Sequence, residues 1–201
     1  MPTDTFFNLS DEKKRRILEA AIDEFAEYRF SDASINRIVK NADISRGSFY
    51  QYFLDKEDLY LFIMQVIAQE KVEIFANAKI QMHPKSFFEA IRMSIPSVQE
   101  WVKRCPKYNK IAMLMTHDDS DIIKKVVDKV DTAREASINM IRQDQANGII
   151  RADIDPNLVL EIYTSMSYSI LRDYYKAESE THSLDKALAV LEIIENGIIK
   201  R

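Results

Sequence analysis

The sequence predicts an all-α protein in which an N-terminal three-helix helix-turn-helix domain is joined to a larger helical domain. Only five prolines and three glycines occur among 201 residues, which leaves little room for strands connected by tight turns. Apolar residues recur at helical spacing along most of the chain. Near the N-terminus, a longer helical segment precedes two short ones that are separated by about four residues, as in a helix-turn-helix unit. We expect domains at 1–56 and 57–201.

The composition is typical of a globular protein, with 46% hydrophobic and 30% charged residues. No apolar run approaches the roughly 20 residues that cross a bilayer, and the N-terminus lacks the basic-then-apolar order of a secretory signal. We therefore expect a cytoplasmic protein with no membrane partner. The net charge of −4 argues against indiscriminate coating of nucleic acid, which needs a broad positive field. Any DNA binding must come from a few well-placed groups.

The first helix is predicted in the segment SDEKKRRILEAAIDEFAEYRF, residues 10–30. Ser10 is placed to cap it, and Asp11 and Glu12 suit the positive end of the helix dipole. The apolar residues of this segment recur on one face, which we expect to be buried. They are Ile17, Leu18, Ala21, Ile22, Phe25 and Ala26.

Two short helices follow. Ser34 is a cap candidate for the first of them, which is expected to end near Asn41. Ser45 can cap the second, in which Phe49 and Phe53 lie one turn apart and are expected to face inward. Braced by the longer helix in front, the pair predicts a helix-turn-helix.

Gly47 is the second residue of the second short helix, where glycine destabilises a helix by roughly 1 kcal/mol relative to alanine. In a helix-turn-helix this helix start points into the major groove, so a missing side chain lets the backbone approach a phosphate or a base edge. Beside it, Arg46 and Ser48 can each bond a base edge or a phosphate. Tyr50 and Gln51 are expected to face outward. The alternative is a surface helix with aromatic anchors, which the spacing of the preceding helix and turn disfavours.

Residues 14–60 resemble the DNA-binding domain of the TetR family of transcriptional regulators. The specific part of the match is GSFYQYFLDKEDLY, which follows the family pattern G-[ST]-[LF]-Y-x-[YH]-F with a lysine before an acidic pair. That lysine, Lys56, adds charge to backbone N–H groups that are disposed to bind a phosphate. Later in the chain only the helical layout and the stretch NGIIRADIDP match. The resemblance implies double-stranded operator DNA as a partner, with contacts from Ser34, Asn36, Arg37, Ser45, Arg46, Gly47, Ser48, Tyr50, Gln51, Tyr52 and Lys56.

Two residues depart from the family pattern, because the family commonly has glycine where this chain has Arg29 and Asp43. Asp43 lies inside the turn, and aspartate tolerates the left-handed conformation better than most residues. Arg29 follows the first helix and indicates that this turn needs no positive φ. Neither departure touches the groove-facing residues.

Beyond the helix-turn-helix the sequence predicts helices and no repeat. Their expected ranges are Lys56–Ile80, Ser86–Lys103, a shorter helix after Pro106, a long helix that starts after Asp121 and runs to Asn147, Pro156–Lys176 and Leu184–Ile199. Leu59, Phe62, Ile63 and Val66 form the buried face of the first. Pro96 is expected to kink or break the second, and Gly148 to close the long helix.

The last two helices are rich in apolar residues and predict a homodimer interface. In a symmetric dimer they would form a four-helix bundle, and a helix-turn-helix protein needs a partner to read two half-sites. The interface residues we expect are Tyr163, Ile170, Tyr174, Leu184, Leu188, Leu191 and Ile194. The alternative is packing within one chain.

Methionine and aromatic residues gather in the central helices, and apart from Met1 no methionine occurs before residue 61. Methionine adapts to irregular space and is frequent where varied apolar ligands bind. The alternative is an ordinary core, but the resemblance favours a pocket for a small apolar or amphipathic inducer. The lining residues we expect are Phe62, Phe87, Phe88, Trp101, Tyr108, Met113, Met140 and Met166.

We expect no metal and no cofactor. The stretch His117–Asp121 could hold a metal, but acidic residues and a serine before a helix also serve as a cap. The single cysteine, Cys105, lacks the partners of a nucleophile and is expected to serve in packing.

These features predict a ligand-responsive dimeric DNA-binding transcriptional regulator, by resemblance a repressor released from a palindromic operator by a small molecule. The alternative is a helical ligand-binding or scaffold protein with a vestigial DNA-binding module. An enzyme is not predicted, because the sequence offers no nucleophile–base pairing, metal-ligand spacing or phosphate loop.

Overall fold

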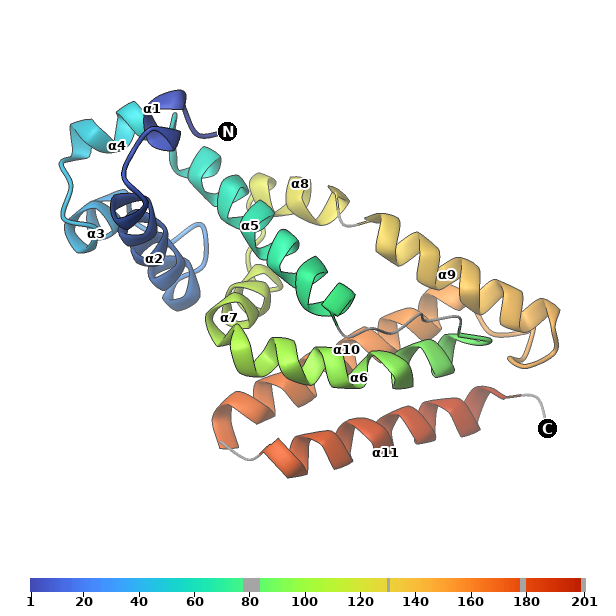
Figure 1. The fold of residues 1–201 in the computed structure, drawn as a ribbon. Helices are drawn as coiled ribbons and strands as arrows, with labels where there is room; N and C mark the ends of the chain where they lie inside the picture. Colours follow the sequence, from blue (N-terminus) through green and yellow to red (C-terminus); the bar gives the residue numbers. More distant parts are fainter. Residues whose placement is uncertain (78–83, 130, 178–179, 200–201) are drawn as a thin grey trace. The chain divides into compact units, whose positions relative to one another are not determined.

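The computed structural model describes residues 1–77, 84–129, 131–177 and 180–199 and confirms the predicted all-α fold (Figure 1). The helices are α1 (Asp4–Phe7), α2 (Asp11–Glu27), α3 (Ile35–Asn41), α4 (Arg46–Tyr52), α5 (Lys56–Asn77), α6 (Phe87–Arg104), α7 (Pro106–Met115), α8 (Asp121–Lys129), α9 (Asp131–Ala146), α10 (Pro156–Ala177) and α11 (Glu180–Ile198). Within the described ranges, β-structure is limited to one isolated antiparallel bridge between Ile150 and Ile199.

The chain folds as two compact units. The first consists of Met1–Ile80 and Pro96–Lys129, and the second of Gln81–Ile95 and Val130–Arg201. The change of unit at Pro96 falls inside α6, which continues through the proline without ending there. The domain boundary expected after residue 56 lies within the first unit, so the division into 1–56 and 57–201 concerns function and stays a prediction.

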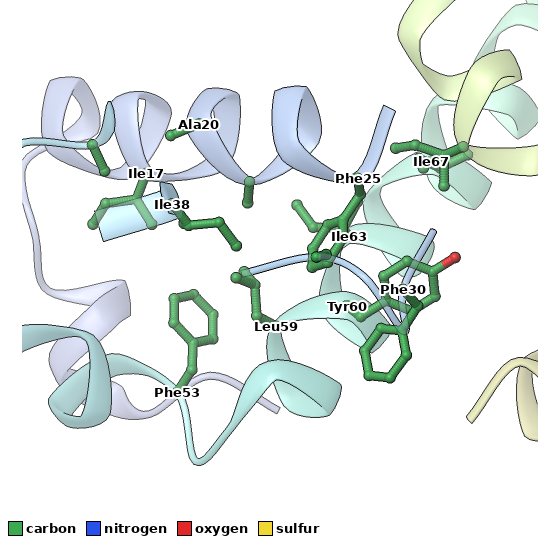
Figure 2. Close-up of a cluster of buried hydrophobic side chains, with 14 of the residues drawn as sticks. Ile17, Ala20, Phe25, Phe30, Ile38, Phe53, Leu59, Tyr60, Ile63 and Ile67 are labelled. Carbon is green, nitrogen blue, oxygen red and sulfur yellow. The ribbon is translucent and has the colours of Figure 1, made fainter. Parts of the chain in front are cut away.

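The core of the first unit forms where α2, α3, α4 and the start of α5 converge (Figure 2). Its buried side chains include Ile17, Ala21, Phe25, Ile38, Phe49, Phe53, Leu59 and Ile63, and α7 and α8 add Ile111, Ile122, Ile123 and Val126. Complete burial of one large apolar side chain stabilises a fold by about 1.5–3 kcal/mol. The inward orientation of Phe49 and Phe53 is confirmed. So is the apolar face of α2, with Leu18, Ile22 and Ala26 half-buried at its edge.

The caps of the short helices follow the sequence only in part. Ser45 caps α4 as predicted, because its hydroxyl oxygen accepts the backbone N–H of Ser48 at 2.9 Å. The predictions for Ser10 and Ser34 are wrong, since neither hydroxyl bonds to a helix N–H. At Ser34 the backbone makes the contact instead: its N–H donates to the buried carboxylate of Glu24 at 2.7 Å.

Asp43 and Arg29, which stand where the family commonly has glycine, have the backbone conformations that we expected. Asp43 has φ 50° and is the one non-glycine residue with positive φ in the described part of the chain. Arg29 has no such conformation, and its guanidinium instead donates to the Asp32 carboxylate at 2.8 Å. The turn between α3 and α4 therefore keeps its left-handed residue without glycine, and the turn after α2 does not need one.

One feature of the helix layout differs from the prediction. The N-terminal helix α1 was not predicted, because four residues are too few to show a helical period. The stretch expected as one helix up to Asn147 is described as α8 and α9, and residue 130 between them lies outside the described residues. Gly148 follows the end of α9 with φ 72° as expected.

In the second unit α10 and α11 pack side by side, and α9 packs on α10. The buried core consists of Phe87, Phe88, Ile138, Ile141, Ile150, Val159, Leu160 and Leu191. Leu191, which was expected at the dimer interface, is only 3% exposed within its own chain. It therefore serves the core of the unit.

A buried carboxylate ties α9 to the start of α6. Asp144 is 1% exposed, and its Oδ2 accepts the backbone N–H of Phe87, the first residue of α6, at 2.8 Å. Burial raises the pKa of the Asp144 carboxyl, and the hydrogen bond from Phe87 opposes that rise only in part. The ionised carboxylate thus occupies a site that favours its protonated form.

We expect Asp144→Asn to be more stable than the wild type at pH 7. The amide oxygen can still accept the Phe87 N–H, while the penalty of a buried charge disappears. Because the folded-state pKa lies above the unfolded value of about 3.9, the wild type regains this stability as the pH falls, and the advantage of the variant should vanish by about pH 4. Thermal unfolding of both proteins across this range measures the difference. As a control, Asp144→Leu removes the acceptor and should cost about 1–3 kcal/mol; a pH-independent advantage of Asp144→Asn would contradict the assignment.

Candidate DNA-binding site

The helix α4 presents one polar face and one buried face. Phe49 and Tyr52 belong to the core, whereas Arg46, Tyr50 and Gln51 are exposed. The outward orientation predicted for Tyr50 and Gln51 is therefore observed. Tyr50 leaves 47% of its surface exposed.

The exposed side chains of α3 and α4 contact one another. The Arg46 guanidinium donates to Asn36 Oδ1 at 2.9 Å and to the Tyr50 hydroxyl at 3.4 Å, and it lies over the Tyr50 ring at 5.9 Å from the centroid. The hydroxyls of Ser45 and Ser48 are hydrogen-bonded at 2.8 Å. The two short helices thus share a surface that offers a guanidinium, an amide and three hydroxyl groups, all of which can bond base edges or phosphates.

A shallow hollow of about 220 Å³ adjoins this surface. It is lined by Ala33, Ser34, Ile35, Asn36, Arg46 and Lys56. Two of these side chains are cationic and none is anionic, so the hollow favours an anionic group such as a DNA phosphate. The fold thus brings residues 33–36, Arg46 and Lys56 together around one hollow.

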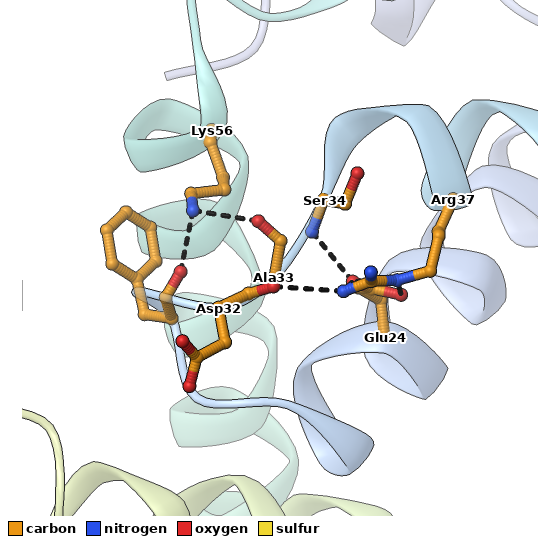
Figure 3. A network of polar contacts seen from close by, with 7 residues as sticks. Glu24, Asp32, Ala33, Ser34, Arg37 and Lys56 are labelled. Carbon is orange, nitrogen blue, oxygen red and sulfur yellow. Dashed lines mark hydrogen bonds and ion pairs between the residues drawn. The ribbon is translucent and has the colours of Figure 1, made fainter.

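Lys56 does not lie free beside this hollow. Its Nζ donates to the backbone carbonyls of Phe30 at 2.7 Å and Ala33 at 2.8 Å, and it lies 4.5 Å from the centroid of the Phe30 ring (Figure 3). Burial lowers the pKa of Lys56, and the nearby carboxylates, Asp118 first among them, oppose that shift. Lys56 therefore holds the loop between α2 and α3 against α5, and one of its three N–H groups remains for an outside partner.

Arg37 is likewise engaged inside the molecule. Its guanidinium donates to both oxygens of the Glu24 carboxylate, at 2.6–3.0 Å, and to the carbonyl of Asp32 at 2.9 Å (Figure 3). Its hydrogen bond with Glu24 raises the pKa of Arg37. The side chain also covers the ring of Tyr28 at 4.0 Å from the centroid. Arg37 thus neutralises a buried carboxylate and stabilises the same loop.

Tyr52 was also expected to contact DNA, but it is only 4% exposed. The centroid of its ring lies 6.4 Å from that of the Phe6 ring. The physical reason is the helical period, which places residue 52 on the same face as Phe49. Its ring belongs to the core and is not presented to DNA. Apart from Tyr52, the predicted residues are at least partly exposed; they are Ser34, Asn36, Arg37, Ser45, Arg46, Gly47, Ser48, Tyr50, Gln51 and Lys56.

The loop between α2 and α3 also bonds to the segment between α7 and α8, within the first unit. The buried carboxylate of Asp118 accepts the backbone N–H of Ser31 at 2.9 Å, and Arg29 donates to the carbonyl of His117 at 3.2 Å. Burial acts to raise the pKa of Asp118, but the hydrogen bonds from Ser31 and Ser120 outweigh it and lower the pKa. Sequence reasoning missed these contacts, since residues 87 positions apart leave no periodic signal.

The stretch His117–Asp121 shows the local bonding of a helix start. Asp118 Oδ1 accepts the N–H of Ser120 at 3.0 Å, and Asp121 opens α8. Among the described residues no three His, Cys, Asp or Glu side chains are grouped so that they could hold a metal ion. In the same part of the chain, none of the helices has both the length and the apolar character needed to cross a membrane.

The eight residues expected to line a ligand pocket fall into both units. Phe62, Trp101, Tyr108 and Met113 belong to the first, and Phe87, Phe88, Met140 and Met166 to the second. The rings of Trp101 and Tyr108 lie 5.8 Å apart, and those of Phe87 and Phe88 5.4 Å apart. Met166 is exposed. The pocket stays a prediction.

The expected interface residues differ in exposure. Leu188 is exposed, Tyr163, Ile170 and Ile194 are half-buried, and Leu191 is buried. The side chains of Tyr174 and Leu184 lie outside the described part of the structure. Other apolar side chains of α10 and α11 are also exposed; they are Leu158, Ile162, Met166, Tyr168 and Ile193.

Comparison with known proteins points in one direction. Residues 17–62 match the family model of bacterial regulatory proteins of the tetR family. The transcriptional regulator UidR of Escherichia coli K12 is 27% identical over 162 residues, 80% of each chain. The transcriptional repressor AcnR of Corynebacterium diphtheriae is 22% identical over 188 residues, 92% of this chain and 91% of the relative. Among solved structures, a TetR family transcriptional regulator from Chloroflexus aurantiacus has a TM-score of 0.81 and 26% identity, with 100% of both chains covered.

Proposed function

We propose that the chain is a TetR-family transcriptional regulator and not an enzyme, that it binds a palindromic operator as a homodimer, and that a small apolar or amphipathic molecule releases it. The similarity to the repressor AcnR supports repression as the sign of regulation.

The exposed cluster of Arg46, Asn36 and Tyr50 carries this proposal. A guanidinium can donate two parallel hydrogen bonds to guanine, an amide can pair with adenine, and a phenol can reach a phosphate. These three side chains contact one another on adjacent short helices, so they form one recognition surface. A module that no longer binds DNA would have no reason to keep an arginine and a tyrosine exposed to solvent side by side.

Dimerisation is supported by apolar side chains that α10 and α11 leave exposed. Ile193 is 71% exposed, and Ile162, Met166 and Leu188 accompany it on these two adjacent helices. A single exposed apolar residue is ordinary, but several on two adjacent helices are typical of an interface. A second chain bound there would supply the second helix-turn-helix that a palindrome requires.

Release by a ligand is supported by the similarity to TetR-family regulators, of which ligand responsiveness is typical. A ligand can act only if it binds the DNA-competent and DNA-incompetent forms with different affinity. The inducer would therefore lower operator affinity when it saturates its site.

We expect Arg46→Ala to weaken operator binding by about 10- to 100-fold, which corresponds to the 1–3 kcal/mol of a good base contact. A duplex enriched from random sequence by the wild-type protein serves as the operator, and fluorescence anisotropy measures the affinity. Two chains bound per duplex would support the dimer.

Arg142→Ala is the matched control. Arg142 on α9 is also exposed and also donates to an asparagine, Asn139, at 3.2 Å, so the substitution makes the same change of charge and contact. Its operator affinity should stay within about twofold, because separated surface charges are screened at physiological salt. If Arg46→Ala and Arg142→Ala bind the operator equally well, α4 is not the recognition helix. If random-sequence selection enriches no duplex, the module is vestigial and the ligand-binding alternative stands.

A further inference from the structure

The helix α4 is too short to fix its own orientation. It has seven residues, and a helix of this length is marginal without outside contacts. The last four carbonyls of any helix lack partners within it. In α4 the N–H of Phe53 bonds to the first of these, the carbonyl of Phe49, at 2.9 Å. The carbonyls of the final turn must find donors elsewhere.

Thr3 supplies those donors from the N-terminal segment. Its hydroxyl donates to the carbonyl of Gln51 at 2.6 Å, and its backbone N–H donates to the carbonyl of Tyr52 at 2.9 Å. Thr3 lies 48 positions before Gln51 in the sequence, so the contact is tertiary and not part of the helix-turn-helix itself. One residue thus closes the C-terminal turn of α4.

Phe6 holds this segment in place independently of Thr3. It is 1% exposed, and its ring centroid lies 4.9 Å from that of Phe53 and 5.7 Å from that of Phe62. The carbonyl of Thr3 in turn accepts the N–H of Phe6 at 3.0 Å, which begins α1. Phe6 anchors the segment in the core, and Thr3 extends from this anchor to the end of α4.

We propose that Thr3 is a positioning residue that fixes the angle of the recognition helix on DNA. This inference rests on the proposed DNA-binding role of α4. Tyr50 and Gln51 lie in the turn that Thr3 closes, whereas Arg46 lies at the opposite end, next to the Ser45 cap. Loss of the Thr3 hydroxyl should therefore misplace Gln51, whose amide can read a base edge, and leave the contacts of Arg46 at the start of α4 in place.

The test compares specific with non-specific DNA binding. Thr3→Val removes the hydroxyl but keeps the shape and the backbone N–H. We expect it to lower affinity for the selected operator about five- to tenfold, the loss of one hydrogen bond, and to leave affinity for scrambled DNA and the salt dependence of binding unchanged. Thr3→Ser keeps the hydroxyl and should restore the wild-type ratio of operator to scrambled affinity.

Thr116→Val is the matched control, because the Thr116 hydroxyl also donates to a carbonyl in the last turn of a helix, that of Met113 in α7, at 2.7 Å. It should leave the affinity ratio unchanged. An unchanged ratio in Thr3→Val would overturn the inference while wild-type operator binding upholds the proposed function. An equal loss toward both DNAs would also overturn it, since that indicates a smaller folded fraction. Absence of operator binding by the wild type would instead overturn the function.

Discussion

Replacing Lys56 with methionine is expected to lower the free energy of unfolding by about 2–3 kcal/mol. Hydrogen bonds from a charged donor contribute about 1.5–3 kcal/mol each, and Lys56 makes two, to the carbonyls of Phe30 and Ala33. Part of this loss is offset, because methionine removes a partly buried charge whose pKa burial lowers. Methionine keeps most of the length and apolar surface of the lysine stem, so the change isolates the amine. Urea unfolding measures it.

Lys124→Met provides the comparison. Lys124 on α8 is an exposed lysine that pairs with Asp121 at 3.2 Å, and an exposed ion pair of this kind contributes about 0–1 kcal/mol. If the two variants lose the same small amount, Lys56 is not a structural tie and the prediction from sequence, a lysine free to bind phosphate, is favoured. The salt dependence of operator binding separates these two roles further. It should drop by about one phosphate contact only if the third N–H of Lys56 reaches the DNA.

The residues that sequence could place are those whose role is set by near neighbours. Phe49 and Phe53 are one turn apart, so helical period alone predicts that they share a buried face, and both are buried. Ser45 directly precedes α4, and its hydroxyl caps the helix as predicted. Asp43 takes the left-handed conformation that the turn requires, as a residue type that tolerates it.

The residues that sequence placed less well depend on distant partners. Ser34 precedes α3 but its hydroxyl makes no cap bond; its backbone N–H donates to Glu24, whose position depends on how α2 packs against α3. The burial of Tyr52 follows from the helical period that it shares with Phe49, but its partner Phe6, from the N-terminal segment, has no local signal. Thr3 lies outside every periodic segment. The partners in these contacts are set by tertiary packing, which a single sequence does not encode locally.

The loop between α2 and α3 shows what such contacts do together. Its backbone is bonded by Lys56 from α5, by Arg37 from α3 and by Asp118 from the segment before α8 (Figure 3 shows the first two). The helix-turn-helix is therefore joined to the rest of the first unit by more than the continuous backbone of α5. Any rearrangement of the segment around Asp118 must either break its bond to Ser31 or carry the loop with it.

Gly47→Leu is expected to raise stability and abolish tight operator binding at once. A Cβ built at Gly47 would meet only the Ser45 hydroxyl oxygen, at 3.7 Å, which is ordinary van der Waals contact. The protein itself therefore does not require glycine there, and the φ angle is not positive. Leucine should improve helix propensity by about 0.5–1 kcal/mol. Leucine at position 47 should therefore stabilise the protein itself. Since the position is also exposed on the recognition surface, we infer that the reason for the glycine lies outside the chain.

On DNA we expect Gly47→Leu to lower operator affinity by about 100-fold, since a side chain holds the backbone away from the groove and costs the 1–3 kcal/mol of at least one neighbouring contact. Gly47→Ala should lie between leucine and the wild type. Gly197→Leu makes the same substitution within α11, where a Cβ would meet nothing within 4 Å, and it is the control for the gain in stability alone. Thermal unfolding and anisotropy on the same preparations give both quantities. Operator affinity that is unchanged in Gly47→Leu would mean that the backbone of α4 does not approach the DNA, and the docking of the recognition helix would have to be revised.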